Sequence, residues 1–180
     1  EFLGNTIERI AFEKGGIIKE GRPVVLYAKE KEVYDTIKKI CDEKHSKLYA
    51  FDDSNAVVTK EELGGTEFNF KSEYCNYDGI KIKLLGDYQI LNASEALLAC
   101  DVLKKEGVEL SEKSIREGLE NARWSGRMEI VEKNPLVMLD GAHNIDGIHM
   151  LAQSLKKYFA DRKLTLLIGI LGDKEYEKML

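Results

Sequence analysis

The first third of the chain alternates short apolar runs with amphipathic stretches. Apolar positions spaced three and four residues apart predict helices, and short continuous apolar runs predict strands. The expected elements are a helix from a capping Asn5 through Lys14, a strand over 23–27, a helix over 29–45 and a strand over 47–51. Glu8 is the expected capping-box partner of Asn5, and Gly15-Gly16 is the expected end of the first helix. The order strand, helix, strand predicts a parallel pair with a helical crossover.

The pattern changes over residues 52–85, where short segments alternate apolar and polar side chains. Strands are expected over 56–59, 66–71 and 80–84, with turn signals between them at Gly64-Gly65 and Asp78-Gly79. An Asp-Gly pair between alternating segments is a strong hairpin signal, because both residues tolerate the positive φ of a tight turn. We therefore expect a small antiparallel region in this part of the chain.

Helical and strand-like segments alternate again from residue 88 onward. Helices are expected over 88–105, 111–122 and 144–159, and strands over 127–131, 136–139 and 164–170, followed by a last helical pattern from Asp173. The return to strand–helix alternation predicts the beginning of a second α/β domain. With a boundary near Ser125, the first domain comprises residues 1–125 and the second comprises residues 126–180.

Composition is that of an ordinary globular protein. Of 180 residues, 43% are hydrophobic and 33% are charged, with a formal net charge of −5, which argues against nucleic acid or an anionic membrane as the partner. No apolar run approaches the roughly 20 residues of a membrane-spanning helix. Cys41, Cys75 and Cys100 lie far apart, which fits reduced thiols in a cytoplasmic protein better than a disulfide framework or a zinc site. The chain lacks an initiator Met and stops within a helical pattern, so we expect a piece of a longer protein.

A polar turn follows the apolar strand expected over 136–139. Its sequence, DGAHN over 140–144, lies between a strand and a helix, where open α/β sheets hold phosphates and other ligands. Asp140 can bind a cation or orient a base, His143 can hydrogen-bond or carry a proton, and Asn144 can cap the helix. The structural alternative is a tight strand-to-helix turn with a capping Asn144 and an incidental histidine.

Four runs taken together resemble one protein family. They are LGNTIE (3–8) with EKGGIIK (13–19), LGDYQILNA (85–93), WSGRME (124–129) and DGAHN (140–144). Their order and spacing are similar to those of the folylpolyglutamate synthases, which resemble the Mur ligases in fold and reaction logic. On this resemblance the fold is α/β, with a truncated Mur-ligase-type central ATPase domain followed by the start of a Rossmann-like C-terminal α/β domain.

The resemblance implies an ATP-dependent amide ligase. Such an enzyme phosphorylates a carboxylate of folate or dihydropteroate, the amino group of L-glutamate attacks the acyl phosphate, and bacterial members often also act as dihydrofolate synthases. The implied cofactors are ATP and Mg²⁺, because metal ions and cationic side chains must offset the repulsion between triphosphate and carboxylate. The implied protein is cytoplasmic, monomeric at full length and part of folate and one-carbon metabolism. No P-loop sequence occurs in these residues, so the family's P-loop would precede Glu1 and this chain alone is expected to be inactive.

The resemblance assigns ATP-binding roles to four side chains and proton-transfer catalysis to none. Asn92 corresponds to an asparagine that contacts adenine, and Arg127 corresponds to an arginine that reaches the phosphates. Asp140 and His143 correspond to residues that meet the nucleotide at the ribose and phosphate from the second domain. The structural alternatives are a helix-start cap or core amide for Asn92 and a surface ion pair with Glu129 for Arg127.

Lys14 corresponds to a lysine that is carbamylated in this family, as N6-carboxylysine, and that ligates Mg²⁺. A plain ammonium group has no acceptor for a cation, whereas a carbamate supplies the oxygen ligands that hard cations prefer. The alternative is an unmodified lysine, which is favourable at the C-terminal end of a helix.

Two other functions remain open. One is another ligase of the Mur superfamily, such as a peptidoglycan-precursor or cyanophycin-type enzyme. The other is a non-enzymatic nucleotide-sensing or partner-binding α/β module that has lost the P-loop.

Overall fold

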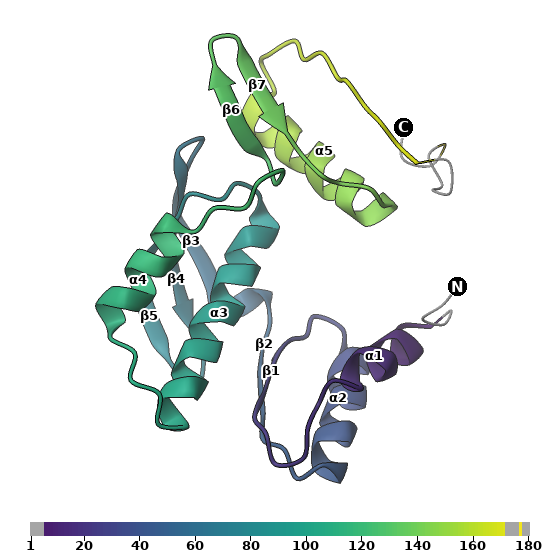
Figure 1. The fold of residues 1–180 in the computed structure, drawn as a ribbon, viewed down its shortest axis with the longest axis vertical. Coiled ribbons are helices and arrows are strands. Elements are labelled where there is room, and N and C mark those ends of the chain that lie inside the picture. The colour runs from purple at the N-terminus through teal and green to yellow at the C-terminus, as the bar shows by residue number, and fades with distance from the viewer. Residues whose placement is uncertain (1–5, 172–176, 178–180) are drawn as a thin grey trace.

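The computed structural model describes residues 6–171 and residue 177, and it has the mixed α/β structure that the sequence predicts. The elements in chain order are α1 (Ile7–Gly15), β1 (Val24–Tyr27), α2 (Lys31–Glu43), β2 (Leu48–Phe51), the 3-10 turn η1 (Asp53–Asn55), β3 (Ala56–Glu62), β4 (Gly65–Lys71), β5 (Asn76–Ile82), α3 (Asp87–Lys105), α4 (Glu112–Asn121), β6 (Glu129–Lys133), β7 (Leu136–Leu139) and α5 (Ile145–Phe159). Figure 1 shows them in three groups: α1 and α2 with β1 and β2, then β3–β5 with α3 and α4, then β6 and β7 with α5. Within the described residues, every helix is too short or too polar to span a membrane.

The first group confirms the predicted parallel pair. β1 and β2 run parallel and in register, and α2 is the crossover between them. α1 lies against α2, and Gly15 permits the close approach because a Cβ at this position would overlap the Ile40 Cδ1. The buried side chains of this small core are Ile18, Ile37, Ile40 and Cys41.

The first helix is capped one residue later than predicted. Thr6, and not Asn5, is the N-cap, because its backbone is extended and its hydroxyl accepts a 3.3 Å hydrogen bond from the Arg9 N–H. Asn5 itself lies outside the described residues. The helix ends at Gly15, with Gly16 as its C-cap, as predicted.

An antiparallel sheet in the order β3–β4–β5 forms the centre of the chain, as predicted. α3 packs on β3 and β4 and also contacts β1, and α4 packs against β5. Phe51 of β2 lies edge-to-face on Phe70 of β4 at a centroid distance of 5.3 Å, so the two sheets and α3 share one core. The largest fully buried side chains of this core are Phe68, Phe70, Ile80, Leu97 and Leu98.

The Asp78-Gly79 pair is not the hairpin turn that the sequence predicted. It lies inside β5, where Gly79 has a φ of 63° and the register between β4 and β5 shifts opposite Asn69. The Asn69 Oδ1 accepts a 2.8 Å hydrogen bond from the Gly79 N–H and so holds this β-bulge, while the β4–β5 connection lies at residues 72–75. A bulge and a tight turn both need positive φ, so the same residue pair suits either feature.

Gly79→Ala is expected to lower the free energy of unfolding by about 1–2 kcal/mol, because an alanine is strained at positive φ. Gly64→Ala, in the turn between β3 and β4, is the matched control, since Gly64 has no positive φ and no atom lies within 4 Å of an added Cβ. Urea denaturation of both variants measures the difference. Equal stability of the two would show that the bulge does not depend on glycine.

The last group of elements begins with a hairpin. β6 and β7 pair antiparallel, and Figure 1 shows α5 alongside them. Asn144 caps α5 as predicted, because its Oδ1 accepts a 2.7 Å hydrogen bond from the Gly147 N–H. The turn between β7 and α5 is therefore well defined by local hydrogen bonds.

The strand predicted over 164–170 is not formed. This segment follows an extended path in Figure 1, but it pairs with no strand in the part of the chain that the structure describes, and Leu167 is 98% exposed. An apolar run favours a strand, but a strand also needs a neighbour for its backbone N–H and C=O groups. The helix predicted from Asp173 lies outside the described residues except for residue 177, which is helical.

Candidate functional site

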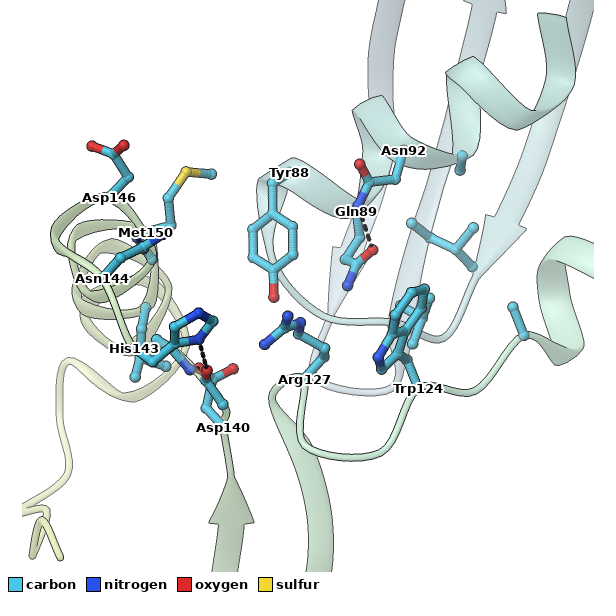
Figure 2. A pocket seen from close by; sticks show the side chains of 18 of the residues that line it. Tyr88, Gln89, Asn92, Trp124, Arg127, Asp140, His143, Asn144, Asp146 and Met150 are labelled. Atoms are coloured by element: carbon cyan, nitrogen blue, oxygen red, sulfur yellow. Dashed lines mark hydrogen bonds between the residues drawn. The ribbon is translucent and has the colours of Figure 1, made fainter. Parts of the chain in front are cut away.

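A cavity of about 680 Å³ lies between α3 and the turn that joins β7 to α5 (Figure 2). Its lining comes from α3, from the segment between α4 and β6, and from the first turns of α5. The side formed by α3, the end of α4 and the segments next to them includes the apolar side chains of Leu84, Leu119 and Trp124. The opposite side, which we call the polar side, includes Asp140 and His143 as well as the apolar Met150 and Leu151, so the cavity suits a ligand with a flat apolar part and a charged part.

Two side chains hold α5 beside the first part of the chain. The Lys157 Nζ lies 2.6 Å from the Glu61 Oε2 and 2.6 Å from the Asp87 Oδ1, which joins α5 to β3 and to the first turn of α3. The Tyr158 hydroxyl donates a 2.5 Å hydrogen bond to the Glu61 Oε1. Burial and this hydrogen bond raise the pKa of Tyr158 to about 12, so the hydroxyl stays protonated and remains a donor. These contacts help to place α5 opposite α3 across the cavity.

Asp140 connects the two turns at the polar side of the cavity. Its Oδ2 accepts a 2.9 Å hydrogen bond from the Met128 N–H, and its Oδ1 accepts a 2.7 Å hydrogen bond from the Ala142 N–H. The Gly141 N–H adds a 2.7 Å hydrogen bond to the Gly126 carbonyl. The segment that carries Arg127 is thereby tied to the turn after β7.

Arg127 reaches into the cavity past a glycine. A Cβ at Gly141 would lie 3.0 Å from the Arg127 Nη1, so only glycine leaves this path open without a shift. Arg127 is half-buried and forms no salt bridge within residues 6–171, and the Glu129 Oε2 instead accepts a 2.8 Å hydrogen bond from the Gly126 N–H. The surface ion pair with Glu129, the structural alternative for Arg127, is therefore not formed.

His143 lies on the side of Asp140 away from Arg127, in the turn just before α5 (Figure 2). Its Nδ1 is 2.9 Å from the Gly141 carbonyl oxygen, which can only accept, so Nδ1 carries a hydrogen and Nε2 is left for another partner. The N-terminal end of α5 also lines the cavity here, and its free N–H groups favour an anion. Asp146 in the same turn adds a carboxylate at the rim.

Tyr88, Gln89 and Asn92, in the first two turns of α3, face the cavity from the other side. The Asn92 side chain is exposed to the cavity, and its Nδ2 donates a 3.0 Å hydrogen bond to the Oε1 of the buried Gln89. Asn92 is thus neither the N-cap of α3, which is Gly86, nor a core amide. Tyr88 is half-buried, and burial together with the charge of Asp140 raises the pKa of its phenol.

The structure brings Asn92, Arg127, Asp140 and His143 together around one cavity. Lys14 is exposed in the last turn of α1 and does not line this cavity. Gln89 and Tyr88 also line the cavity, and neither was singled out as a site residue from the sequence. Gln89 had a detectable signal, since residues three apart on a helix share a face and Gln89 precedes Asn92 by three.

Known proteins resemble the chain along nearly its whole length. Residues 126–180 match the family model described as Mur ligase, glutamate ligase domain. The dihydrofolate synthase/folylpolyglutamate synthase of Bacillus subtilis is 38% identical over 180 residues, which cover 99% of this chain and 42% of that protein. The crystal structure of folylpolyglutamate synthase from Thermotoga maritima matches with a TM-score of 0.83 and 39% identity, over 98% of this chain and 42% of that one. A solved folylpolyglutamate synthase complex with AMPPCP and folate matches with a TM-score of 0.84 and 34% identity, over 98% of this chain and 43% of that one. The chain therefore spans 42–43% of the length of these relatives.

Proposed function

We propose that this chain, which is homologous to the folylpolyglutamate and dihydrofolate synthases along 99% of its length, forms the nucleotide-facing part of an ATP-dependent amide ligase. The reaction adds L-glutamate to folate or dihydropteroate. ATP transfers its γ-phosphoryl group to the substrate carboxylate, and the glutamate amino group then attacks the acyl phosphate and releases phosphate. The observation that carries this proposal is the single cavity that Asn92, Arg127, Asp140 and His143 line together.

The apolar side of the cavity takes the adenine ring. Trp124 and Leu119 supply flat and apolar surface there, and Asn92 offers both a donor and an acceptor to the edge of the base. Because Trp124 is 66% exposed, its indole is free to cover a ligand. A nucleotide whose base binds on this side would extend its phosphates toward the polar side of the cavity.

The polar side takes the phosphates. Arg127 has a planar fork of N–H donors that matches phosphate oxygens, and it is not used in a salt bridge within the described residues. His143 contributes Nε2, and the N-terminal end of α5 adds backbone N–H groups. Asp140 holds the segments that carry Arg127 and His143 through its hydrogen bonds to backbone N–H groups. Its carboxylate oxygens keep lone pairs that can accept a hydrogen bond from a ribose hydroxyl.

Magnesium would be held partly by Lys14 as N6-carboxylysine. Its exposed ammonium at the end of α1 leaves room for a carbamate, whose oxygens suit a hard cation. Within residues 6–171 no cluster of three or more histidine, cysteine or acidic side chains could hold a metal ion, so Lys14 would need partners elsewhere in the natural polypeptide. When bound, Mg²⁺ would offset negative charge on the phosphates.

The proposed domain boundary lies at residues 125 and 126. Residues 1–125 contain the parallel pair, the antiparallel sheet and the helices α1–α4, and they would be the C-terminal part of the central ATP-binding domain. Residues 126–180, which match the glutamate ligase domain model, would be the N-terminal part of the C-terminal α/β domain. The cavity lies where these two parts meet.

A cytoplasmic, monomeric enzyme without a nucleic-acid or membrane partner is the proposed setting. The three cysteines Cys41, Cys75 and Cys100 are free thiols, as expected for a reducing compartment. Burial raises the pKa of Cys75 to about 11, so this thiol is protonated and a poor nucleophile at neutral pH.

His143→Ala is expected to raise the dissociation constant for AMPPCP about tenfold in the natural polypeptide that contains these residues, because one hydrogen bond to a charged phosphate is lost. His149→Ala is the matched control, since His149 is exposed on α5 and does not line the cavity. Isothermal titration calorimetry measures the affinities, and circular dichroism checks the fold.

Unchanged affinity in His143→Ala would remove this histidine from the proposed nucleotide site. Turnover of folate or dihydropteroate with ATP and L-glutamate tests the ligase itself. Tight nucleotide binding without any such turnover would favour the non-enzymatic nucleotide-binding module instead.

A further inference from the structure

We propose that Gln89 is a positioning residue that orients the Asn92 amide and thereby makes the cavity prefer adenine to a 6-oxo purine. Gln89 is buried in α3, one turn before Asn92, whereas Asn92 is exposed in the cavity. This inference rests on the proposed function, in which Asn92 contacts the base of a bound nucleotide.

The geometry between the two amides supports this role. The Asn92 Nδ2 donates a 3.0 Å hydrogen bond to the Gln89 Oε1, and Figure 2 shows both side chains on the same side of the cavity. Gln89 is only 5% exposed, so packing restricts its side chain, whereas Asn92 alone would be free to rotate its amide. In this arrangement the Asn92 Nδ2 faces Gln89, and the Asn92 Oδ1 is left to face the ligand.

That orientation determines which base edge Asn92 can bind. With Nδ2 directed toward Gln89, the Asn92 Oδ1 is left as an acceptor, and the second Nδ2 proton remains available as a donor. An acceptor next to a donor matches the exocyclic amino group and ring nitrogen of adenine. Hypoxanthine presents a carbonyl oxygen where adenine presents the amino group, so two acceptors would face each other.

The surroundings make this mismatch costly. Leu84, Leu119 and Trp124 line the same side of the cavity, so a base bound there loses contact with much of the solvent. A polar group that is desolvated without a partner is penalised far more than one that remains in water. Rotation of the Asn92 amide would relieve the mismatch, and the hydrogen bond to Gln89 opposes that rotation.

The test compares ADP with IDP, which differ in the base and share the same diphosphate. The ratio of their dissociation constants, measured by calorimetry in the natural polypeptide that contains these residues, cancels changes that affect both ligands equally. Gln89→Met removes the acceptor at similar volume, and Gln89→Glu retains an acceptor. Gln153→Met is the matched control, because Gln153 is exposed on α5 and does not line the cavity.

The unsubstituted protein is expected to bind ADP at least about tenfold more tightly than IDP. Gln89→Met is expected to reduce this preference about tenfold, while Gln89→Glu and Gln153→Met retain it. In an Asn92→Ala background, Gln89→Met should have no further effect on the ratio, since the two residues act as one unit. A purely structural role for Gln89 would change the affinities for ADP and IDP together and leave their ratio unchanged.

An unchanged ratio in Gln89→Met, or an equal change in the Asn92→Ala background, would overturn the positioning role. Failure of the unsubstituted protein to bind ADP would instead contradict the proposed function. If Gln89→Met does not fold, hydrogen exchange of the side-chain amides in the unsubstituted protein decides the matter. Slower exchange at Asn92 than at the exposed Asn134 supports the role, and equal exchange contradicts it.

Discussion

Arg127→Ala is expected to raise the dissociation constant for AMPPCP about 100-fold in the natural polypeptide, because two charge-assisted hydrogen bonds to phosphate are worth about 3 kcal/mol together. Arg127→Lys should recover only part of this affinity, since an ammonium group keeps the charge but lacks the planar fork of donors. Titration calorimetry with AMPPCP measures both variants.

Arg123→Ala is the matched control for this prediction. Arg123 is exposed, does not line the cavity, and donates a 2.9 Å hydrogen bond to the Ala122 carbonyl. Near-normal affinity is therefore expected for this variant. A loss of affinity as large as that of Arg127→Ala would attribute the effect to general surface charge.

Gly141→Ala tests the contact between Arg127 and the phosphates without changing the arginine. The added Cβ would lie 3.0 Å from the Arg127 Nη1 and 3.2 Å from the Gly126 carbonyl oxygen, so these atoms would have to give way by a few tenths of an ångström. This variant should lose affinity for AMPPCP, but less than Arg127→Ala, because the guanidinium donors are retained. Full affinity in Gly141→Ala would show that the observed path of Arg127 past the glycine is not the one used with nucleotide bound.

Phe68→Ala is expected to lower the free energy of unfolding by about 3–5 kcal/mol, because it removes a large side chain and leaves a cavity. Phe68 is 0% exposed in β4, the central strand of the antiparallel sheet. Phe12→Ala is the matched control, since Phe12 is 62% exposed on α1, and its loss should be below about 1 kcal/mol. Urea denaturation followed by circular dichroism measures both. Similar losses for the two variants would contradict the core assigned to β3–β5 and α3.

Helix boundaries were largely predictable because their signals are local. Ser111 caps α4 and Asn144 caps α5 through side-chain hydrogen bonds to backbone N–H groups within three residues. Gly107 follows the end of α3 with a φ of 91°, a conformation that favours glycine. Each of these features involves a few consecutive residues, so the amino-acid pattern contains the whole interaction.

Strand features were less predictable because pairing is not local. Asp78-Gly79 forms a bulge instead of a turn because Asn69, on the neighbouring strand, holds the Gly79 N–H. Residues 164–170 have strand composition, but they pair with no strand in the described part of the chain. In both cases the outcome depends on a partner distant in sequence.

For the motifs around the cavity, too, the sequence indicated the chemistry of each side chain, and the fold decided whether the side chains meet. Their residue types indicated which side chains can contact a nucleotide, because an amide, a guanidinium, a carboxylate and an imidazole have definite donors and acceptors. Whether Asn92 on α3 meets the other three side chains involves contacts of Lys157 with Glu61 and Asp87, which join residues 70 or more positions apart. The chemistry of each group is a property of its residue type, and their convergence on one cavity is a property of the folded chain.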